Sequence, residues 1–235
     1  MDEIFKRVGK KGGELYNRAR WYWQSAAGTE QDAIKSEYIL GRHLASDLPG
    51  HVKIDDSPDL NDRVRHIGRS LENRLKNKDR SFRYTILESG NLNAYALPGG
   101  FIFITLGLLD QIRDYPDEIA FVLGHEIMHV VLGHPLKRIF NGYGTKLLKV
   151  ILANYSKTGA VTRQVIDQFM SGQYSQDMEF EADAGGKILM QAAGYNAEKS
   201  VRLLHRLKGV SGQKGRLYNY FSSHPPLEKR IEKLV

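Results

Sequence analysis

The sequence predicts a mainly helical α+β fold with a small sheet. Apolar residues recur at helical spacing in residues 61–75, where Val64, Ile67 and Leu71 share one face. Residues 82–87 alternate between apolar and polar side chains, which is typical of a strand buried on one side. The 235 residues include 41% hydrophobic and 26% charged residues, an ordinary balance for a globular domain with an extension.

Turn and cap signals separate the expected elements along the chain. Pro98, Gly99 and Gly100 indicate a turn between two apolar strands. Residues 114–118 are a strong helix start, because proline suits the first turn and acids favour the positive end of the helix dipole. Gly194 is the expected end of a later helix. We expect helices in residues 1–48 (with a break near 28–29), 61–75, 114–133, 142–160, 173–193, 197–207 and 227–234, and strands in residues 82–87, 93–97 and from 101 onward.

The chain is expected to divide into two regions. Residues 1–60 form an N-terminal helical extension, and residues 61–235 form the main domain. The uncharged run in residues 89–109 is not expected to cross a membrane, because Asn, Pro and Gly residues interrupt it. No signal peptide is visible, because no apolar segment follows the first basic residues.

The formal net charge of +7 raises the question of an anionic partner. Basic residues gather in residues 6–11, 63–83 and 202–216, but acids such as Glu72 and Asp79 lie among them. This mixing favours solvated helix faces, so we expect no nucleic-acid partner and leave peripheral membrane contact open. The chain has no cysteine, which excludes disulfides and thiolate ligands. Any metal site must therefore use His, Asp or Glu.

A metal-binding motif lies on the helix expected in residues 114–133. His125 and His129 are four residues apart, so they project from one helix face and can hold one zinc ion. Glu126 points beside the metal and can take a proton from a zinc-bound water. Residue counts give about 0.015 chance matches to this His-Glu-x-x-His pattern in the chain. The flanking residues are apolar, so these polar side chains are expected to be buried together with partners.

The third ligand must come from elsewhere in the chain. His134 is five residues beyond His129 and rotated off the ligand face, so we interpret it as a helix-end histidine near the negative dipole. Glu179 and Asp183 are four apart on the helix of residues 173–193. Glu179 is the better candidate ligand, and Asp183 could accept a hydrogen bond from the far nitrogen of a ligating histidine. Gly186 shares the face of Glu179 and would let the two helices pack closely.

Four sequence blocks, spanning roughly residues 60 to 235, resemble the gluzincin family of the CAAX prenyl proteases, the heat-shock protease HtpX and the mitochondrial Oma-type proteases. Each block occurs in the order typical of that family. The blocks are Asn93-Ala94-Tyr95-Ala96-Leu97-Pro98-Gly99-Gly100, the His-Glu-x-x-His helix, the Glu179-x-Glu181-Ala182-Asp183 helix, and Ser223-His224-Pro225-Pro226-Leu227-Glu228-Lys229-Arg230.

The resemblance implies a zincin-like metallopeptidase domain with one Zn²⁺ per chain and Glu126 as general base. The family's third zinc ligand falls on Glu179, and its acid four residues later falls on Asp183. His224 faces the active site in this family, where it would stabilise the oxyanion or bind the zinc and hold the enzyme latent. Arg230 would orient His224 or the nearby loop.

The resemblance also implies a substrate and a compartment. The strand containing Asn93, Ala94, Tyr95 and Ala96 would be the edge to which an extended polypeptide adds. The chain is similar to the compact bacterial members, because it lacks the long transmembrane helices of the membrane-embedded ones. The periplasm or cell envelope is expected if a targeting segment was removed, and the cytoplasm if the chain is complete. The oligomeric state stays open.

Two alternatives to a working endopeptidase remain at this point. One is a latent, self-inhibited protease that acts mainly as a chaperone-like binder, with the apolar residues 147–152 as a plug over the site. The other is a basic module for nucleic acid or membrane surfaces with a vestigial site. The intact motif and the intact Glu179 argue against a vestigial site.

Overall fold

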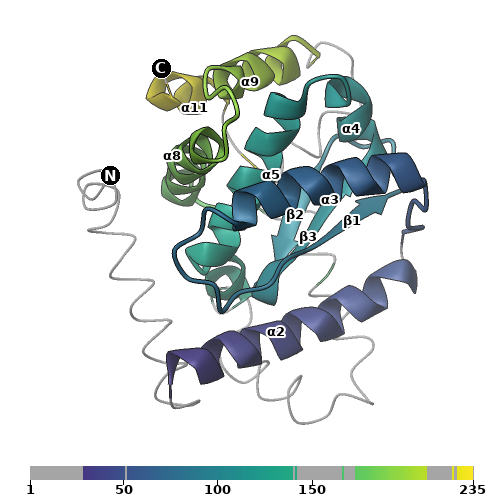
Figure 1. Ribbon diagram of the computed structural model, residues 1–235, viewed down its shortest axis with the longest axis vertical. Coiled ribbons are helices and arrows are strands. Elements are labelled where there is room, and N and C mark those ends of the chain that lie inside the picture. Colours follow the sequence, from purple (N-terminus) through teal and green to yellow (C-terminus); the bar gives the residue numbers. More distant parts are fainter. Residues whose placement is uncertain are drawn as a thin grey trace.

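A computed structural model describes residues 29–50, 52–139, 141, 166, 173–210, 224 and 227–234. Within these residues the chain is mainly helical around a small three-stranded sheet, so the predicted α+β class is confirmed (Figure 1). The elements are α2 (Glu30–Asp47), η1 (Leu48–Gly50), α3 (Pro58–Glu72), β1 (Arg83–Leu87), β2 (Ala94–Leu97), η2 (Pro98–Gly100), β3 (Phe101–Thr105), α4 (Leu106–Ile112), α5 (Pro116–Val131), α8 (Gln176–Ala192), α9 (Lys199–Val210) and α11 (Leu227–Leu234).

Most predicted elements occur within a few residues of their expected bounds. The expected break near residues 28–29 falls where Thr29 caps α2 through a reciprocal pair of bonds with Asp32. One helix, α4, was not predicted. The expected helices in residues 1–28 and 142–160 lie outside the described residues, as does the proposed plug at residues 147–152.

The sheet has the order β1-β3-β2, with β1 parallel and β2 antiparallel to β3. Strand β2 is therefore an edge strand among the described strands. The turn between β2 and β3 needs glycine, because Gly99 and Gly100 have φ angles of 74° and 92°. A Cβ on Gly99 would also lie 2.4 Å from the Cα of Tyr38 in α2. The turn thus allows α2 to approach the sheet backbone to backbone.

Helices cover both faces of the sheet. Alternate residues of β2 enter different apolar clusters: Ala94 and Ala96 pack with α3 and α5, whereas Tyr95 and Leu97 pack with α2. Figure 1 shows α2 on one side of the sheet, away from α8, α9 and α11. Every residue of β3 is buried, which agrees with the apolar run from Phe101 to Ile104 before the polar Thr105.

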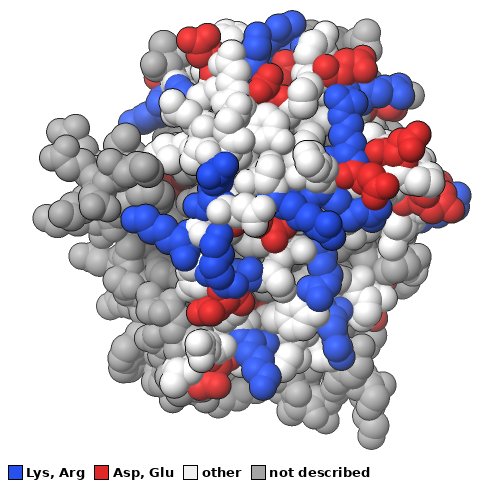
Figure 2. Space-filling model, viewed as in Figure 1, with Lys and Arg blue, Asp and Glu red and all other residues white. Residues whose placement is uncertain are grey.

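Charged side chains of both signs share the surface. On the face drawn in Figure 2, Lys and Arg side chains lie among Asp and Glu side chains. Exposed pairs such as Lys53–Glu88 and Arg65–Asp62 contribute little to stability. No described helix combines the length and the apolarity that crossing a bilayer requires.

Helices α5 and α8 cross at a glycine contact. A Cβ on Gly186 would lie 2.9 Å from the backbone nitrogen of His125 and 3.1 Å from the carbonyl carbon of Gly124. The predicted close packing at Gly186 is therefore confirmed. This contact sets the distance between the two helices that carry the His-Glu-x-x-His motif and Glu179.

The substitution Gly186→Ala is expected to lower the free energy of unfolding by about 1–3 kcal/mol relative to Gly185→Ala. Both changes gain the same helix propensity, about 1 kcal/mol, so their difference reports on packing. The new Cβ of Gly186→Ala meets backbone, whereas that of Gly185→Ala meets the movable side chain of Met128. Urea denaturation of both variants measures the difference, and equal midpoints would contradict the backbone contact.

Candidate metal centre

Helix α5 presents two imidazoles to one point. His125 and His129 are almost fully buried, and their Nε2 atoms lie 2.9 Å apart. The helix begins with Pro116 in its first turn, followed by Asp117 and Glu118, as the start signal predicts. The ligand-spaced histidines therefore follow from one regular helix, with no backbone distortion.

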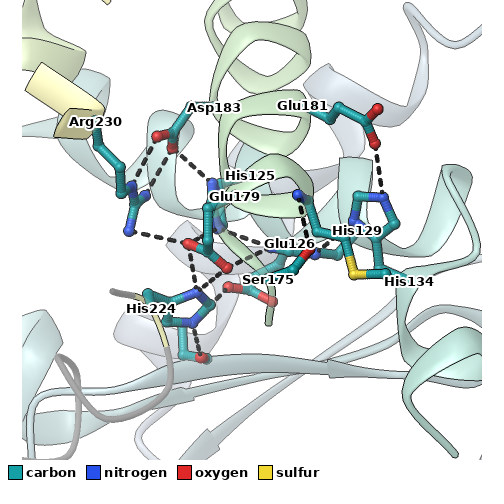
Figure 3. Close-up of polar contacts among 12 residues, drawn as sticks. His125, Glu126, His129, His134, Ser175, Glu179, Glu181, Asp183, His224 and Arg230 are labelled. Carbon is teal, nitrogen blue, oxygen red and sulfur yellow. Dashed lines mark hydrogen bonds and ion pairs between the residues drawn. The ribbon is translucent and has the colours of Figure 1, made fainter. Parts of the chain in front are cut away.

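Helix α8 brings a carboxylate to the same point. Oε1 of Glu179 lies 3.4 Å from Nε2 of His129, and Oε2 lies 3.6 Å from Nε2 of His125. The side chain of Ser175 caps α8 by accepting a bond from the Met178 amide, which places Glu179 in the first turn. Figure 3 shows Glu179 pointing from α8 toward the two histidines.

These spacings fit a zinc ion. Zinc with ligand distances of about 2.0–2.1 Å in tetrahedral geometry would space its ligand atoms about 3.3 Å apart. The ligand atoms of His125, His129 and Glu179 have separations of 2.9, 3.4 and 3.6 Å. Together with His224, they offer four ligand atoms within 4.8 Å of one another. Two histidines and one glutamate are the donor set of a well-known class of catalytic zinc site.

The charge states of these groups also suit a cation. Burial, reinforced by nearby His125, holds the pKa of His129 well below its usual value, so its ring is neutral and able to bind a metal. Burial alone would raise the pKa of Glu179, but the charges of His224 and Arg230 outweigh it and hold that pKa well below the usual range. The site therefore contains a neutral imidazole and an ionised carboxylate facing one another.

A second layer of buried groups holds the ligands in place. Nδ1 of His125 donates to Oδ1 of Asp183 at 2.8 Å. Arg230 donates from Nε and Nη2 to both oxygens of Asp183, at 2.7 and 2.6 Å. Its Nη1 lies 3.1 Å from Oε2 of Glu179. One fully buried guanidinium thus bridges the carboxylate of the ligand set and the carboxylate behind His125.

His129 has a different second-layer partner. Its Nδ1 lies 2.9 Å from Nδ1 of His134, whose Nε2 lies 3.2 Å from Oε2 of Glu181. The ring of Tyr174 stacks on His129 with centroids 4.1 Å apart. These contacts of His134, Glu181 and Tyr174 were not predicted from the sequence. The glycine that precedes His134 was an available signal, because a helix that ends at glycine changes direction there.

His224 reaches the site from the segment before α11. Its Nδ1 lies 2.9 Å from Oε1 of Glu179, and its Nε2 lies 3.2 Å from the carbonyl oxygen of Ala94. Both partners are acceptors, so both ring nitrogens act as donors in this arrangement. Burial alone would lower the pKa of His224, but Glu179 and Glu126 raise it above the usual value. The neighbouring Ser223, Pro225 and Pro226 lie outside the described residues.

Glu126 lies beside the ligand set with free acceptor capacity. Its carboxylate is almost fully buried, and its Oε2 has no hydrogen-bond partner among the described residues. Burial raises its pKa, although His224 and His125 partly oppose this effect. A buried carboxylate with an unused oxygen retains the capacity to accept a hydrogen bond or a proton.

The predicted substrate edge meets the site at one end. Ala94 contacts His224 through its carbonyl oxygen, and Asn93 is bonded to Thr105 on β3. The side chain of Ala96 faces the same cluster as Ala94, whereas Tyr95 faces the opposite side of the sheet. Only backbone groups of this strand, together with small alanine side chains, face the helix that carries the histidines.

The fold and this site define a zinc metalloendopeptidase of the His-Glu-x-x-His class. The chain belongs to Peptidase family M48, whose sequence model matches residues 58–235. The family resemblance inferred from the four motif blocks is therefore confirmed. Metalloproteases of this family depend on zinc.

Several named proteins are similar to the chain. It is 28% identical over 211 residues to the metalloprotease YcaL of Escherichia coli K12, covering 88% of this chain and 80% of YcaL. It is 26% identical over 175 residues to the metalloprotease LoiP of the same organism, covering 72% and 67%. It is 29% identical over 157 residues to the mitochondrial metalloendopeptidase OMA1 of Schizosaccharomyces pombe, covering 66% and 46%. The match thus spans less than half of that OMA1 relative.

Proposed function

We propose that this chain is a zinc-dependent endopeptidase that hydrolyses internal peptide bonds of unfolded or misfolded proteins. One zinc ion would be held by His125, His129 and Glu179. The observation that carries the proposal is the unpartnered, buried oxygen of Glu126 beside a complete His-His-Glu donor set. A purely structural zinc site has no need of a free carboxylate beside its ligands.

Each residue has a distinct part in the proposed reaction. Bound zinc would supply Lewis acidity, which polarises a carbonyl group and lowers the pKa of water. Glu126 would take a proton from the attacking water and deliver it to the leaving amine nitrogen. Asp183 and Arg230 would keep His125 and Glu179 in their ligating orientations through the bonds described above.

His224 would stabilise the negative oxygen that develops on the substrate carbonyl. Its support would be electrostatic: both ring nitrogens donate to acceptors, so the ring carries a positive charge beside the ligand set. Its Nε2 lies 3.7 Å from Glu126 Oε1, close to the place where the proton is transferred. In this arrangement the positive charge of His224 is better suited to stabilise an oxyanion than its ring is to bind the metal, which needs an unprotonated nitrogen.

The substrate would lie along β2. This strand pairs only with β3 among the described strands, and an extended chain would add to its outer edge. All four residues of β2 are buried, so the incoming chain would have to displace what covers that edge. Its Ala94 end is the end that contacts His224. Backbone pairing would require an extended substrate chain and would depend little on its side chains. Unfolded substrates would therefore be favoured over folded ones.

Purified protein is expected to contain one zinc ion per chain and to cleave casein, and both properties should be lost together after treatment with a strong chelator. Stoichiometric zinc should restore cleavage, whereas magnesium should not, because histidine ligands favour zinc. Elemental analysis and a casein assay on the same samples make the measurement. A metal-free protein that still cleaves casein would disprove the metal requirement, and a zinc-loaded protein that never cleaves would disprove the endopeptidase activity.

A further inference from the structure

We propose that His134 is a positioning residue for the reaction, which fixes the ring of His129 from behind and is itself held by Glu181. The inference rests on the metal-binding role proposed for His129 above. It adds a second support to the site, separate from the Asp183–Arg230 support behind His125.

The hydrogen bonds from His129 through His134 to Glu181 have directions that follow from the need of His129 to keep a lone pair for the metal. His129 presents Nε2 to the other ligands, so that nitrogen must carry a lone pair when it binds an ion. Its proton is then on Nδ1, which donates to Nδ1 of His134 at 2.9 Å. The proton of His134 is consequently on Nε2, which donates to Glu181 at 3.2 Å. Every donor and acceptor is satisfied with both rings neutral.

A break in the helix brings His134 into this position. On a continuous helix, a residue five positions beyond His129 would point to a different face. Helix α5 ends at Val131, and Gly133 has a φ angle of 69°, in the left-handed region that favours glycine. The chain turns there, and residues 134–139 begin a new helical segment. The reversal returns the ring of His134 to His129.

The two ligating histidines therefore have different supports. His125 donates directly to the carboxylate of Asp183, whose charge Arg230 compensates. His129 donates to a neutral imidazole, and the carboxylate of Glu181 is one residue further away. A carboxylate partner makes a ligand more basic than an imidazole partner does, so the support behind His129 acts mainly through orientation.

The site gives His129 no easy substitute for this bond. His134 is fully buried, and the ring of Tyr174 covers one face of His129 at 4.1 Å. If His134 were replaced by an apolar residue, the Nδ1 proton of His129 would lose its acceptor in a dry environment. The ring could then rotate or change tautomer, and either change moves the lone pair on Nε2 away from the metal.

The experiment compares His134→Leu, His134→Gln and the control Leu136→Ala. Leu136 is a buried apolar residue of the same helical segment. Its truncation weakens the local packing but leaves the hydrogen bonds among His129, His134 and Glu181 unchanged. Each protein is stripped of metal, and its zinc Kd is measured by competition with a chromophoric chelator. The absorption spectrum of the cobalt(II) form and the kcat and KM for a peptide substrate complete the comparison.

The inference predicts a zinc Kd about 10–100-fold higher for His134→Leu, with an altered cobalt spectrum and a lower kcat at similar KM. His134→Gln should recover most of the loss, because its amide oxygen can accept from His129 and its NH₂ can donate to Glu181. Leu136→Ala should keep the zinc Kd and the cobalt spectrum of the wild type despite its lower stability.

A wild-type Kd and spectrum in folded His134→Leu would overturn the inference and leave the proposed function standing. Equal losses in Leu136→Ala and His134→Leu would also overturn it, because the effect would then come from packing. A wild-type protein that binds no zinc would instead overturn the proposed function, and the inference with it.

Discussion

Replacement of Arg230 by methionine is expected to lower the free energy of unfolding of the zinc-free protein by about 3–5 kcal/mol. Arg230 is fully buried and holds two buried carboxylates, Asp183 and Glu179. Methionine fills a similar volume but leaves both negative charges without this cation. Most of this loss in the free energy of unfolding comes from leaving two buried carboxylates without a compensating cation, and less comes from the contacts of arginine itself.

The effect of Arg230→Met should depend on pH in a defined direction. Burial alone would raise the pKa of Asp183, but Arg230 and the bonded His125 lower it below the usual value. A carboxyl whose pKa is lower in the folded state stabilises the fold fully above its unfolded-state pKa of about 3.9. This stabilisation is lost as the pH falls toward the folded-state pKa. The unfolded state is common to both proteins, so the gap in stability between wild type and variant follows their folded-state pKa values. Without Arg230, burial raises the pKa of these carboxyls in the variant, so the gap should begin to narrow above about pH 4 and continue to narrow as the pH falls.

Urea denaturation of the zinc-free proteins at neutral and acid pH makes this measurement. Lys229→Met is a matched control, because it removes one positive charge from the neighbouring, exposed position of α11. The control should lie within about 0.5 kcal/mol of wild type. Similar losses for the two variants would show that net charge, and not the buried bridge, is responsible.

Glu126→Gln is expected to lower kcat by roughly 10²–10⁴-fold while zinc stays at one ion per chain. Glutamine has nearly the same shape but cannot take a proton from water at neutral pH. Glu126 is outside the proposed ligand set, so metal binding should survive the change. The free energy of unfolding should not fall, because the substitution removes a buried charge whose Oε2 has no partner among the described residues.

Glu118→Gln is the matched control for Glu126→Gln. Glu118 is a buried glutamate of the same helix, but it pairs with Arg206, away from the ligand set. Its substitution should reduce stability and leave kcat near the wild-type value. Elemental analysis, peptide hydrolysis and denaturation of both variants make the comparison. Retained cleavage in Glu126→Gln would exclude this glutamate as the general base.

Much of the fold could be predicted because local patterns decide it. The alternation in residues 82–87 and the apolar run after Pro98-Gly99-Gly100 indicated two of the strands. Helix α4 was missed because its cap, Thr105, is also the last residue of β3, so no separate start signal occurs. The parallel pairing of β1 with β3 could not be predicted either, because it joins segments that are not consecutive in the sequence.

In the site, too, features within one helix could be predicted from the sequence, whereas contacts between helices distant in the sequence could not. The spacing of His125 and His129 is a property of one helix, so sequence alone indicated it. The bridge from Arg230 to Asp183 and Glu179 depends on how α11 packs against α8, which no local pattern encodes. His134 was correctly placed outside the ligand set, but its contact with His129 was not predicted, because that contact depends on the direction the chain takes after the turn at Gly133.

The burial of α5 has a consequence for how the site opens. All residues of α5 from Glu118 to Val130 are buried, and the helix packs on α3, α8, α9 and the sheet. Its amides can exchange their hydrogens with water only when most of the molecule unfolds. Helix α11 has an exposed face, and its detachment is a smaller event. We therefore expect that detachment of α11 would remove the guanidinium of Arg230 while both α5 histidines stay in place, and that the dissociation rate of a bound ion would follow the motion of this last helix.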